Sequence, residues 1–578
     1  MKSNRPDVIL KKYRSIFLSA VAVEMVTFIV SLIDPVIAGR CIGIDALSAI
    51  SLFSPFISIS TFVAAVINTG TLIKYTTMVG KFQKKRADEV FSQGVIMAVL
   101  AGVLVTLVIL LIKPLFISSL SVSAQLEGYL KRYYSIAAFY PMFFPIQCVL
   151  NNIIVAQGGE KYAACANVLC IAANLILSLW LAGAFGVSGI AAATLASNVV
   201  FTAALVMWFF IRKRDIRLVR YFSFKEFSGI VKCGIVKASK FVSVSLMLWI
   251  ADLYIVRNFD EVTFKVWTVG QNIIGMSSVF LGLAMTLQPM IATLLEENNT
   301  KTIRILVRRL LGDLAALGAG CTAIMLCFTG AVLRCFSVPR GDVWEQGITA
   351  VRITSLMLVF SAVTAGFFVY YILIGRQRLA FVISLLTDLI CPVGMLLLFG
   401  TLFKGSPVML WTALAVSGAV AFILCALIAF LHRGENSFPL MLARGRDEQI
   451  HIYSFEITAQ SSSEMARITE DLLRDNGFSK RLRLLVSACI EDMLGLTAQR
   501  SGNKKRHLLA ECTLMIDRGS VQVIMRDNGE RFDISEQGTQ EYTFLRYTVE
   551  RLMTVTDHNA YISTAGYNRS ELFFTDNR

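Results

Sequence analysis

Four acidic residues lie inside long apolar runs, and they are the residues of this sequence best placed to do chemistry. Glu24, Asp34, Asp252 and Asp388 each have mostly apolar neighbours on both sides. A carboxylate in hydrocarbon costs about 2.5–3.5 kcal/mol on insertion scales, so a retained one often binds a proton, a cation or a substrate. The alternative for each is a structural hydrogen bond or ion pair; Arg257, for example, is close enough in sequence to pair with Asp252.

The spacing of these acids favours a polar cavity. Glu24 precedes Asp34 by ten residues, nearly three helical turns, so both face broadly the same side of one predicted helix unless Glu24 reaches another polar neighbour. Asp388 lies shortly before Pro392, and a proline kink in a membrane helix exposes backbone groups that a cavity can satisfy. We therefore expect these carboxylates to bind a proton, a cation or a polar ligand.

The composition identifies the kind of chain that holds them. Of 578 residues, 55% are hydrophobic and only 16% are charged, whereas soluble domains are about 25% charged. This indicates a polytopic membrane protein with a smaller soluble part. The net charge of +15 then reflects basic cytoplasmic loops rather than nucleic-acid binding.

A membrane-spanning helix needs about 20 mostly apolar residues. The sequence before residue 435 contains twelve such runs. Their approximate bounds are 15–39, 47–73, 90–112, 133–156, 163–183, 188–211, 233–256, 266–290, 309–332, 350–373, 379–401 and 408–431. Lys and Arg concentrate in the N-terminus and in the even-numbered loops, which predicts cytoplasmic N- and C-termini in a multi-pass protein of the cell membrane.

The apolar part contains an internal repeat. The stretch around Asp34 aligns with the stretch around Asp252 at an offset of 218 residues, and residues 155–169 align with 372–386 at an offset of 217. Six predicted helices therefore precede six related ones. Such a parallel repeat, with its axis along the membrane normal, is typical of transporters whose sites lie near the bilayer midplane.

Beyond residue 435 the sequence becomes charged and mixed. Strand-like and amphipathic helical segments alternate from His451 onward, which predicts an α+β domain with two or three helices on one face of an antiparallel sheet. The predicted divisions are an N-terminal segment 1–14, two six-helix bundles at 15–220 and 221–435, a linker at 436–450 and the α+β domain at 451–578.

Several segments together resemble the multidrug and toxin extrusion (MATE) family. They include DPVIAGRCIGIDALSA, which resembles the opening pattern of the family, and QGGEKYAACANVLCIAANLILSLWLAGAFGVSGIAAATLAS, which resembles its fourth-to-sixth helix signature. TLQPMIATL resembles the Gln-Pro of the eighth helix, and ILIGRQRLAFVISLL resembles the second-half counterpart of the signature. The resemblance covers about 70% of the chain. It implies an ion-binding cluster of Asp34 with Asn174, and with a further Asp where this chain has Ser178. A weaker cation site follows from that missing carboxylate.

The resemblance also implies a function. Members of the family export small, often cationic and amphiphilic molecules by antiport with H⁺ or Na⁺, and they need no bound cofactor. One alternative is a lipid-linked oligosaccharide flippase of the same superfold, although few Lys or Arg lie mid-helix to hold a pyrophosphate. A second is a membrane-embedded signalling protein. No G-x-x-x-x-G-K-[ST] loop for ATP-driven transport occurs in the sequence.

The C-terminal domain resembles the GHKL ATP-binding fold of histidine kinases and anti-sigma factors. Glu491 and the Asp527-Asn528-Gly529 run match its nucleotide-binding motifs. The chain departs from the family at Gly495, where the resemblance implies a Mg²⁺-binding Asn, and at Arg531, where it implies a Gly. Three interpretations remain: a regulatory or partner-binding domain that has lost catalysis, a weak ATP-binding signalling domain, or a different fold.

Overall fold

The computed structural model divides the chain into two compact units, and we describe each by itself. The membrane unit contains Ala20–Met285 and Arg309–Arg433, and the sheet unit contains Met1–Ser19, Thr286–Arg308 and Gly434–Arg578. The residues described are all except 1, 4–6, 81–83, 121–122, 158, 212–217, 220, 286, 288–289, 292–293, 296–298, 404–405, 432–448, 502–507, 518, 530–557, 565–566 and 577–578. A helix predicted near residues 542–553, and Arg531, lie outside the described residues.

Helices account for almost all of the described chain before residue 432. They are α1 (Asp7–Ser31), α2 (Ile33–Cys41), α3 (Ile44–Leu52), α4 (Ser54–Gly80), α5 (Lys84–Ser119), α6 (Ala124–Ala137), α7 (Tyr140–Ala156), α8 (Glu160–Phe185), α9 (Val187–Ile211), α10 (Phe224–Asn258), α11 (Glu261–Gly275), α12 (Ser277–Met285), α14 (Thr300–Cys327), α15 (Thr329–Cys335), α16 (Asp342–Ser355), α17 (Met357–Leu373), α18 (Gln377–Leu385), the π-helical turn η1 (Leu386–Ile390), α19 (Cys391–Leu402) and α20 (Pro407–Leu431).

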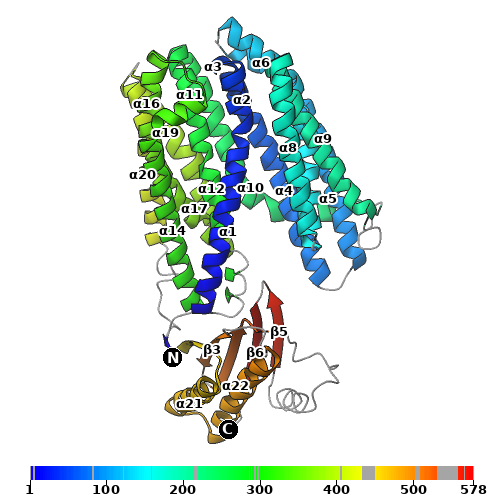
Figure 1. The fold of residues 1–578 in the computed structure, drawn as a ribbon, viewed down its shortest axis with the longest axis vertical. Coiled ribbons are helices and arrows are strands. Elements are labelled where there is room, and N and C mark those ends of the chain that lie inside the picture. Colours follow the sequence, from blue (N-terminus) through cyan, green and yellow to red (C-terminus); the bar gives the residue numbers. More distant parts are fainter. Residues whose placement is uncertain are drawn as a thin grey trace. The chain divides into compact units, whose positions relative to one another are not determined.

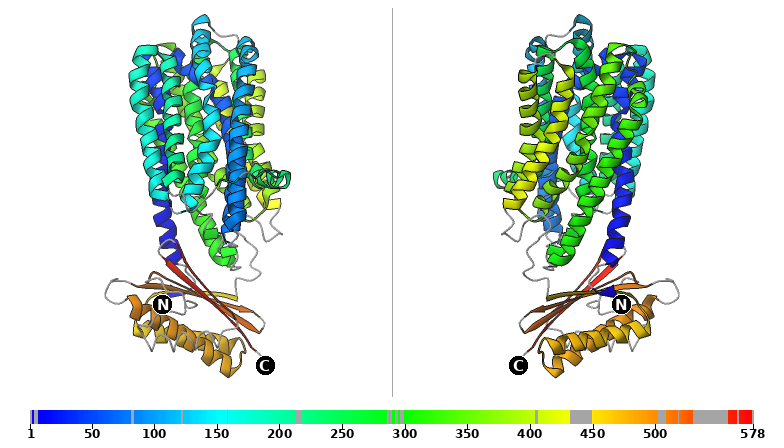
Figure 2. Two further views of the ribbon diagram at one scale, coloured as in Figure 1. Left: turned by 90° about the vertical axis from the view of Figure 1, so that its right-hand side faces the viewer. Right: turned by 90° about the vertical axis from the view of Figure 1, so that its left-hand side faces the viewer.

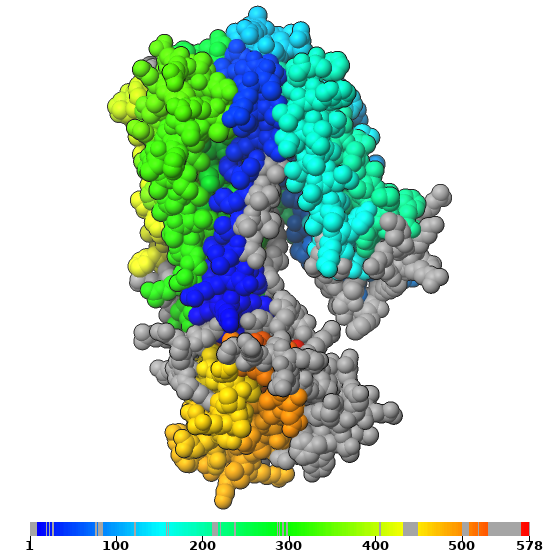
Figure 3. All heavy atoms as spheres, in the orientation of Figure 1, coloured from blue at the N-terminus to red at the C-terminus, as the bar shows by residue number. Residues whose placement is uncertain are grey.

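Ten helical stretches of the described chain are long and apolar enough to cross a membrane, or eleven if the bent pair α6–α7 is one span. The predicted count of twelve is therefore not confirmed. The run expected at 15–39 is helical, but it is interrupted at Leu32 between α1 and α2. Figure 3 shows these first helices, in blue, lying between α14 in green and α8 in cyan.

The helices of the membrane unit gather into two groups. Figure 1 shows α4, α5, α8 and α9 on one side of α1 and α2, and α11, α16, α17, α19 and α20 on the other. Within the first group α8 packs along α9, and α5 packs against α7; within the second, α20 packs against α17 and α19.

The two groups meet most closely where α4 crosses α10. A Cβ atom added to Gly70 would lie 2.0 Å from the carbonyl oxygen of Ile230, and one added to Gly234 would lie 1.9 Å from that of Val66. Only glycine permits this approach of one backbone to another, as small residues do at other membrane helix crossings. We call this crossing the glycine seam.

The sheet unit contains six strands that all pair antiparallel, in the order β1-β2-β3-β4-β6-β5. The strands are β1 (Lys2–Ser3), β2 (Ile450–Glu456), β3 (Leu509–Asp517), β4 (Ser520–Asp527), β5 (His558–Thr564) and β6 (Tyr567–Thr575). Helices α21 (Ala459–Asp475) and α22 (Lys480–Ser501) pack on one face, as Figure 2 shows. The predicted order of strands and helices is thus confirmed for the described residues, apart from β1.

Alternating side chains separate the two faces of this sheet. Cys512 and Leu514 on β3 point into the core shared with α22, whereas Glu511 and Thr513 point the other way. Both of the latter are nevertheless fully buried. The second face is therefore covered as well.

The covering contacts of the second face come from segments distant in sequence. The backbone N–H of Ile9, in the first turn of α1, donates to Glu511 at 3.5 Å, and Arg526 pairs with the same carboxylate at 3.2 Å. Lys301, near the start of α14, donates to the carbonyl of Ile450 at 3.1 Å. Strand β1 extends the edge of β2. The first turns of α1 and α14 thus belong to the sheet unit.

The glycine seam predicts that a Gly→Val substitution lowers stability more at the seam than at a glycine with open space around it. Gly234→Val forces a side chain into the Val66 carbonyl, so we expect destabilisation of about 1–3 kcal/mol, the usual scale of overpacking. The measurement is the apparent melting temperature in detergent. Gly320→Val on α14 is the control because a Cβ there meets nothing within 4 Å. Equal melting temperatures for the two variants would contradict the seam.

Candidate functional site

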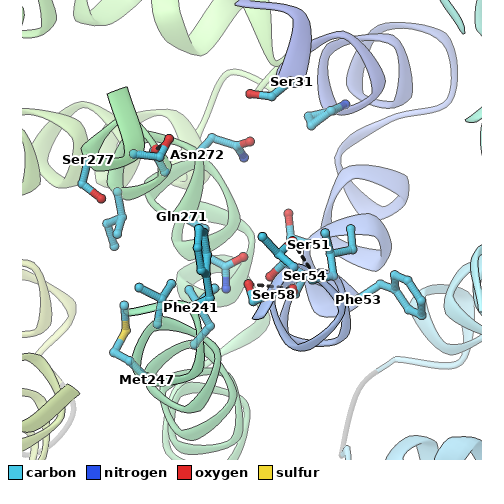
Figure 4. A pocket seen from close by; sticks show the side chains of 18 of the residues that line it. Ser31, Ser51, Phe53, Ser54, Ser58, Phe241, Met247, Gln271, Asn272 and Ser277 are labelled. Atoms are coloured by element: carbon cyan, nitrogen blue, oxygen red, sulfur yellow. Dashed lines mark hydrogen bonds between the residues drawn. The ribbon is translucent and has the colours of Figure 1, made fainter. Parts of the chain in front are cut away.

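A cavity of about 660 Å³ lies within the membrane unit and is lined by helices from both groups. Its wall is rich in hydroxyl and amide side chains. Figure 4 shows several of these, and they are Ser31, Ser51, Ser54, Ser58, Gln271 and Asn272. Phe53, Phe241 and Met247 add apolar surface. A cavity of this kind suits a small molecule that has both polar and apolar parts.

Asp34 lies in the cavity wall, in the first turn of α2. Its two carboxylate oxygens accept hydrogen bonds from different helices: Oδ2 from Thr194 Oγ1 at 2.6 Å, and Oδ1 from Ser178 Oγ at 3.1 Å. Asn174 donates in turn to Thr194 Oγ1 at 3.3 Å. The predicted group of Asp34, Asn174 and Ser178 is therefore close together in space, and Thr194 joins it.

Asp34 follows a one-residue turn at Leu32 and precedes Pro35. Leu32 keeps αR dihedral angles, donates to the carbonyl of Ile29 at 3.1 Å and accepts from the N–H of Val36 at 2.9 Å, so the helical path is nearly continuous. Pro35 has no N–H to donate to the preceding turn, which accounts for the local irregularity. The three hydroxyl and amide neighbours are neutral, so the site leaves room for a proton or a cation to supply a full charge.

Glu24 does not share the position of Asp34. Ten residues fall short of three full helical turns by about 80°, and the carboxylate of Glu24 lies over Gly282 of α12, within 2.2–2.6 Å of where a Cβ would stand. Glu24 does not line the described cavity. Its role in ion binding remains a prediction without support from the cavity.

Asp252, the repeat counterpart of Asp34, is buried behind the cavity wall. Its Oδ1 accepts hydrogen bonds from Trp267 Nε1 at 2.6 Å and from Gln271 Nε2 at 2.5 Å, both on α11. In the described part of the chain, Asp252 Oδ2 and Gln271 Oε1 are buried without a donor. Gln271 lines the cavity, so it connects Asp252 to it.

Asp388 lines the cavity and is paired with a base that the sequence reading missed. Lys240 Nζ on α10 lies 2.9 Å and 3.1 Å from the two carboxylate oxygens. Lys240 lines the cavity too. Its position inside a long apolar helix was the available signal, since a buried base in a membrane usually has an acidic partner.

An ion pair also joins the two helix groups outside the cavity. Lys265 on α11 lies 2.9 Å from Asp45 on α3 and 3.2 Å from Glu261. Ser123, just before α6, donates to Glu261 at 3.2 Å. These contacts hold the α3–α6 end of one group against the α11 end of the other.

The residues of the C-terminal domain that the GHKL resemblance singles out lie on α22 and at the end of β4. Glu491 accepts a hydrogen bond from Ser463 at 2.6 Å, and Gly495 has open space around it. Asp527 is buried, and its Oδ1 accepts from the N–H of Gly529 at 2.8 Å and from Asn568 at 2.9 Å. In the described residues no group of three or more His, Cys, Asp or Glu is arranged to hold a metal.

Comparisons with known proteins agree on the fold of the membrane part. Residues 20–180 match the family model described as MatE. A solved inward-facing multidrug resistance MATE family transporter of the MOP superfamily is 20% identical, with a TM-score of 0.65 over 70% of this chain and 93% of that one. An outward-facing structure of such a transporter is 21% identical, with a TM-score of 0.60 over 73% and 95% of the two chains.

A third solved structure has a similar backbone. It is a MOP superfamily transporter from Pyrococcus furiosus, described as having reverse polarity in its binding pocket. It is 20% identical, with a TM-score of 0.61 over 73% of this chain and 95% of that one. No curated protein matches the chain. The membrane part therefore has the fold of MATE and MOP transporters, and the matched proteins are transporters, not enzymes.

The hydrogen bonds at Asp34 predict the effect of losing one donor. Thr194→Val removes the 2.6 Å bond without a large change in volume, so we expect destabilisation of about 1–3 kcal/mol from a buried acceptor without its donor. Thr412→Val is the matched control, because both threonines also bond the carbonyl four residues earlier. Melting temperatures in detergent compare the two; a loss no larger for Thr194→Val would show that the bond to Asp34 contributes nothing to stability.

Proposed function

We propose that the chain is a MATE-type secondary transporter of the cell membrane that exports small molecules by antiport with H⁺ or Na⁺. The observation that carries this proposal is Asp34, a carboxylate in the cavity wall whose donors are neutral hydroxyl groups from α8 and α9. Such a carboxylate binds a proton or a small cation, or an organic cation in its place. The cavity, the fold and the match over residues 20–180 support the same function.

Exchange at Asp34 explains coupling in physical terms. While Asp34 is charged, the cavity attracts a cationic substrate; once a proton or Na⁺ binds there, that attraction is lost and the substrate can leave. A ligand drives such a change only through its different affinity for the two states. Asn174 and Thr194 orient the carboxylate, and Ser178 supplies a hydroxyl where the family resemblance implies a second acid.

Asp252 provides the second ion site of this proposal. Asp252 Oδ2 is a buried acceptor without a donor in the described part of the chain, as is Gln271 Oε1, and each is costly unless it binds a proton or a cation. Oxygen ligands suit Na⁺ as well as a proton. Gln271 donates to Asp252 and also lines the cavity. Binding of an ion at Asp252 would therefore change the position of a side chain in the cavity wall.

Nothing in the cavity favours the flippase alternative. A pyrophosphate group needs several unpaired cations, whereas Lys240 is already paired with Asp388. The other carboxylate in the wall, Asp34, would repel an anionic lipid headgroup. We therefore keep a cationic, amphiphilic small molecule as the proposed substrate.

Replacing the carboxylate tests the proposal directly. We expect Asp34→Asn to reduce gradient-driven efflux of a cationic dye from proteoliposomes to the level of protein-free vesicles, because the amide binds neither a proton nor a cation. A pH gradient and a Na⁺ gradient, applied in turn, identify the coupling ion.

Asp313→Asn on α14 is the matched control, since Asp313 pairs with Arg309 and does not line the cavity. Melting temperature and a monodisperse elution profile establish that both variants are folded. Efflux at the wild-type rate from folded Asp34→Asn protein would refute coupling at this residue.

We further propose that the C-terminal domain regulates transport and does not hydrolyse ATP, with termini in the cytoplasm and a cytoplasmic protein as a candidate partner. Its sheet and helices support the GHKL resemblance, and Asp527 has the buried position that reading adenine requires. Yet Asp527 is already engaged by Gly529 and Asn568, and Gly495 offers no side chain to a Mg²⁺ ion.

From the missing side chain at Gly495 we predict that the C-terminal domain binds nucleotides weakly or not at all. We expect full-length protein titrated with Mg·ATP to show no dissociation constant in the low micromolar range and no turnover, because the phosphates lack a protein-bound Mg²⁺. The whole chain is needed since the first turn of α1 completes the sheet unit. Gly495→Asn is the informative variant: tight binding by the wild type would revive the signalling alternative, and binding gained only by Gly495→Asn would support lost metal ligation.

A further inference from the structure

Lys240 and Asp388 form an ion pair in the cavity wall. The pair differs from the Asp34 site, where the carboxylate has only neutral hydroxyl donors. The side chains of Lys240 and Asp388 are only 10% and 12% exposed, and the ammonium spans both carboxylate oxygens at 2.9 Å and 3.1 Å. Ser384 donates to Asp388 Oδ2 at 3.2 Å. Asp388 is thus a cation-binding carboxylate whose bound cation is the ammonium group of Lys240.

The backbone around Asp388 is built to present it. Pro392 has no N–H, so it cannot donate to the carbonyl of Asp388 four residues earlier as an α-helix requires. Residues Leu386–Ile390 instead form a π-helical turn, and such single turns are frequent at functional sites. Thr387, Asp388 and Pro392 all line the cavity. The distorted turn thus lies at the cavity wall, with the carboxylate of Asp388 in the lining.

The ammonium group of Lys240 has a second favourable position near an aromatic ring. Its ammonium lies 5.8 Å from the ring centroid of Phe368 on α17, within the range of a cation–π interaction. The four-carbon stem is flexible. The ammonium can therefore leave Asp388 and remain over the aromatic face, which reduces the cost of separating a buried pair.

We propose that Lys240 is a tethered cation that occupies Asp388 in the empty cavity and is displaced from it by the cationic group of the cargo. This inference rests on the proposed transport function and narrows its substrate class. Because Lys240 donates hydrogen bonds to both oxygens of Asp388, its replacement must do so too. Primary or secondary ammonium, amidinium and guanidinium groups meet this requirement, whereas a quaternary ammonium does not.

The opposite role would leave a different signature. If Lys240 bound an anionic part of the cargo, removing its charge would weaken binding. If it competes with the cargo for Asp388, removing it strengthens binding. The sign of one affinity change therefore separates the two roles.

The test uses dansylcadaverine, which carries a primary ammonium, and its trimethylammonium analogue, titrated by fluorescence into full-length protein in detergent. We expect the wild type to prefer the primary ammonium. Lys240→Met should bind the primary ammonium probe about tenfold more tightly, because the probe no longer competes with Lys240 for Asp388. Tenfold corresponds to the contribution of about one charge-assisted hydrogen bond. Asp388→Asn should bind the probe more weakly and lose the preference.

The controls keep the result interpretable. Lys74→Met removes another paired lysine, bonded to Glu226 outside the cavity wall, and should leave both affinities unchanged. Lys240→Gln replaces Lys240→Met if the latter does not fold, with the same direction of change. Weaker binding by either Lys240 variant, or unchanged binding and preference in Asp388→Asn, overturns the proposal. No gradient is applied, so a failure of antiport at Asp34 would appear in the efflux assay and not here.

Discussion

A polar group inside the membrane unit must find its partner within the protein, because hydrocarbon offers none. Three carboxylates meet this constraint in three ways. Asp34 accepts hydroxyl hydrogens from two other helices, Asp252 accepts from an indole and an amide, and Asp388 pairs with an ammonium. Asp34 and Asp252 have only neutral donors and can still bind a proton or a cation, whereas Asp388 already has a cationic partner. We assign different roles to the three carboxylates on this basis.

The two acids that align in sequence have different surroundings. Asp34 borders the cavity, whereas Asp252 lies behind Gln271. Asp34 precedes Pro35 and follows the turn at Leu32, whereas Asp252 lies inside the uninterrupted helix α10. A similar position in the sequence therefore does not give the two carboxylates the same access to the cavity.

Local sequence patterns predicted the apolar helices and most strands of the C-terminal sheet, because each depends on a short periodicity. The grouping of Asp34 with Asn174 and Ser178 was also accessible, through the family resemblance. Thr194, Lys240 and Trp267 were missed because their significance comes from a partner on another helix. The expected alignment of Glu24 with Asp34 failed because ten residues are about 2.8 helical turns, which leaves the two side chains about 80° apart around the helix. Strand β1 is two residues long, and only its distant partner β2 makes it a strand.

The glycine seam has a consequence for the surrounding lipid. Where the backbone of α4 touches that of α10, even one added carbon atom does not fit, so an acyl chain cannot wedge between them. At Gly70 and Gly234 the two backbones themselves therefore close the space between α4 and α10 to lipid. A larger side chain at either position would open a gap there at the same time as it destabilised the crossing.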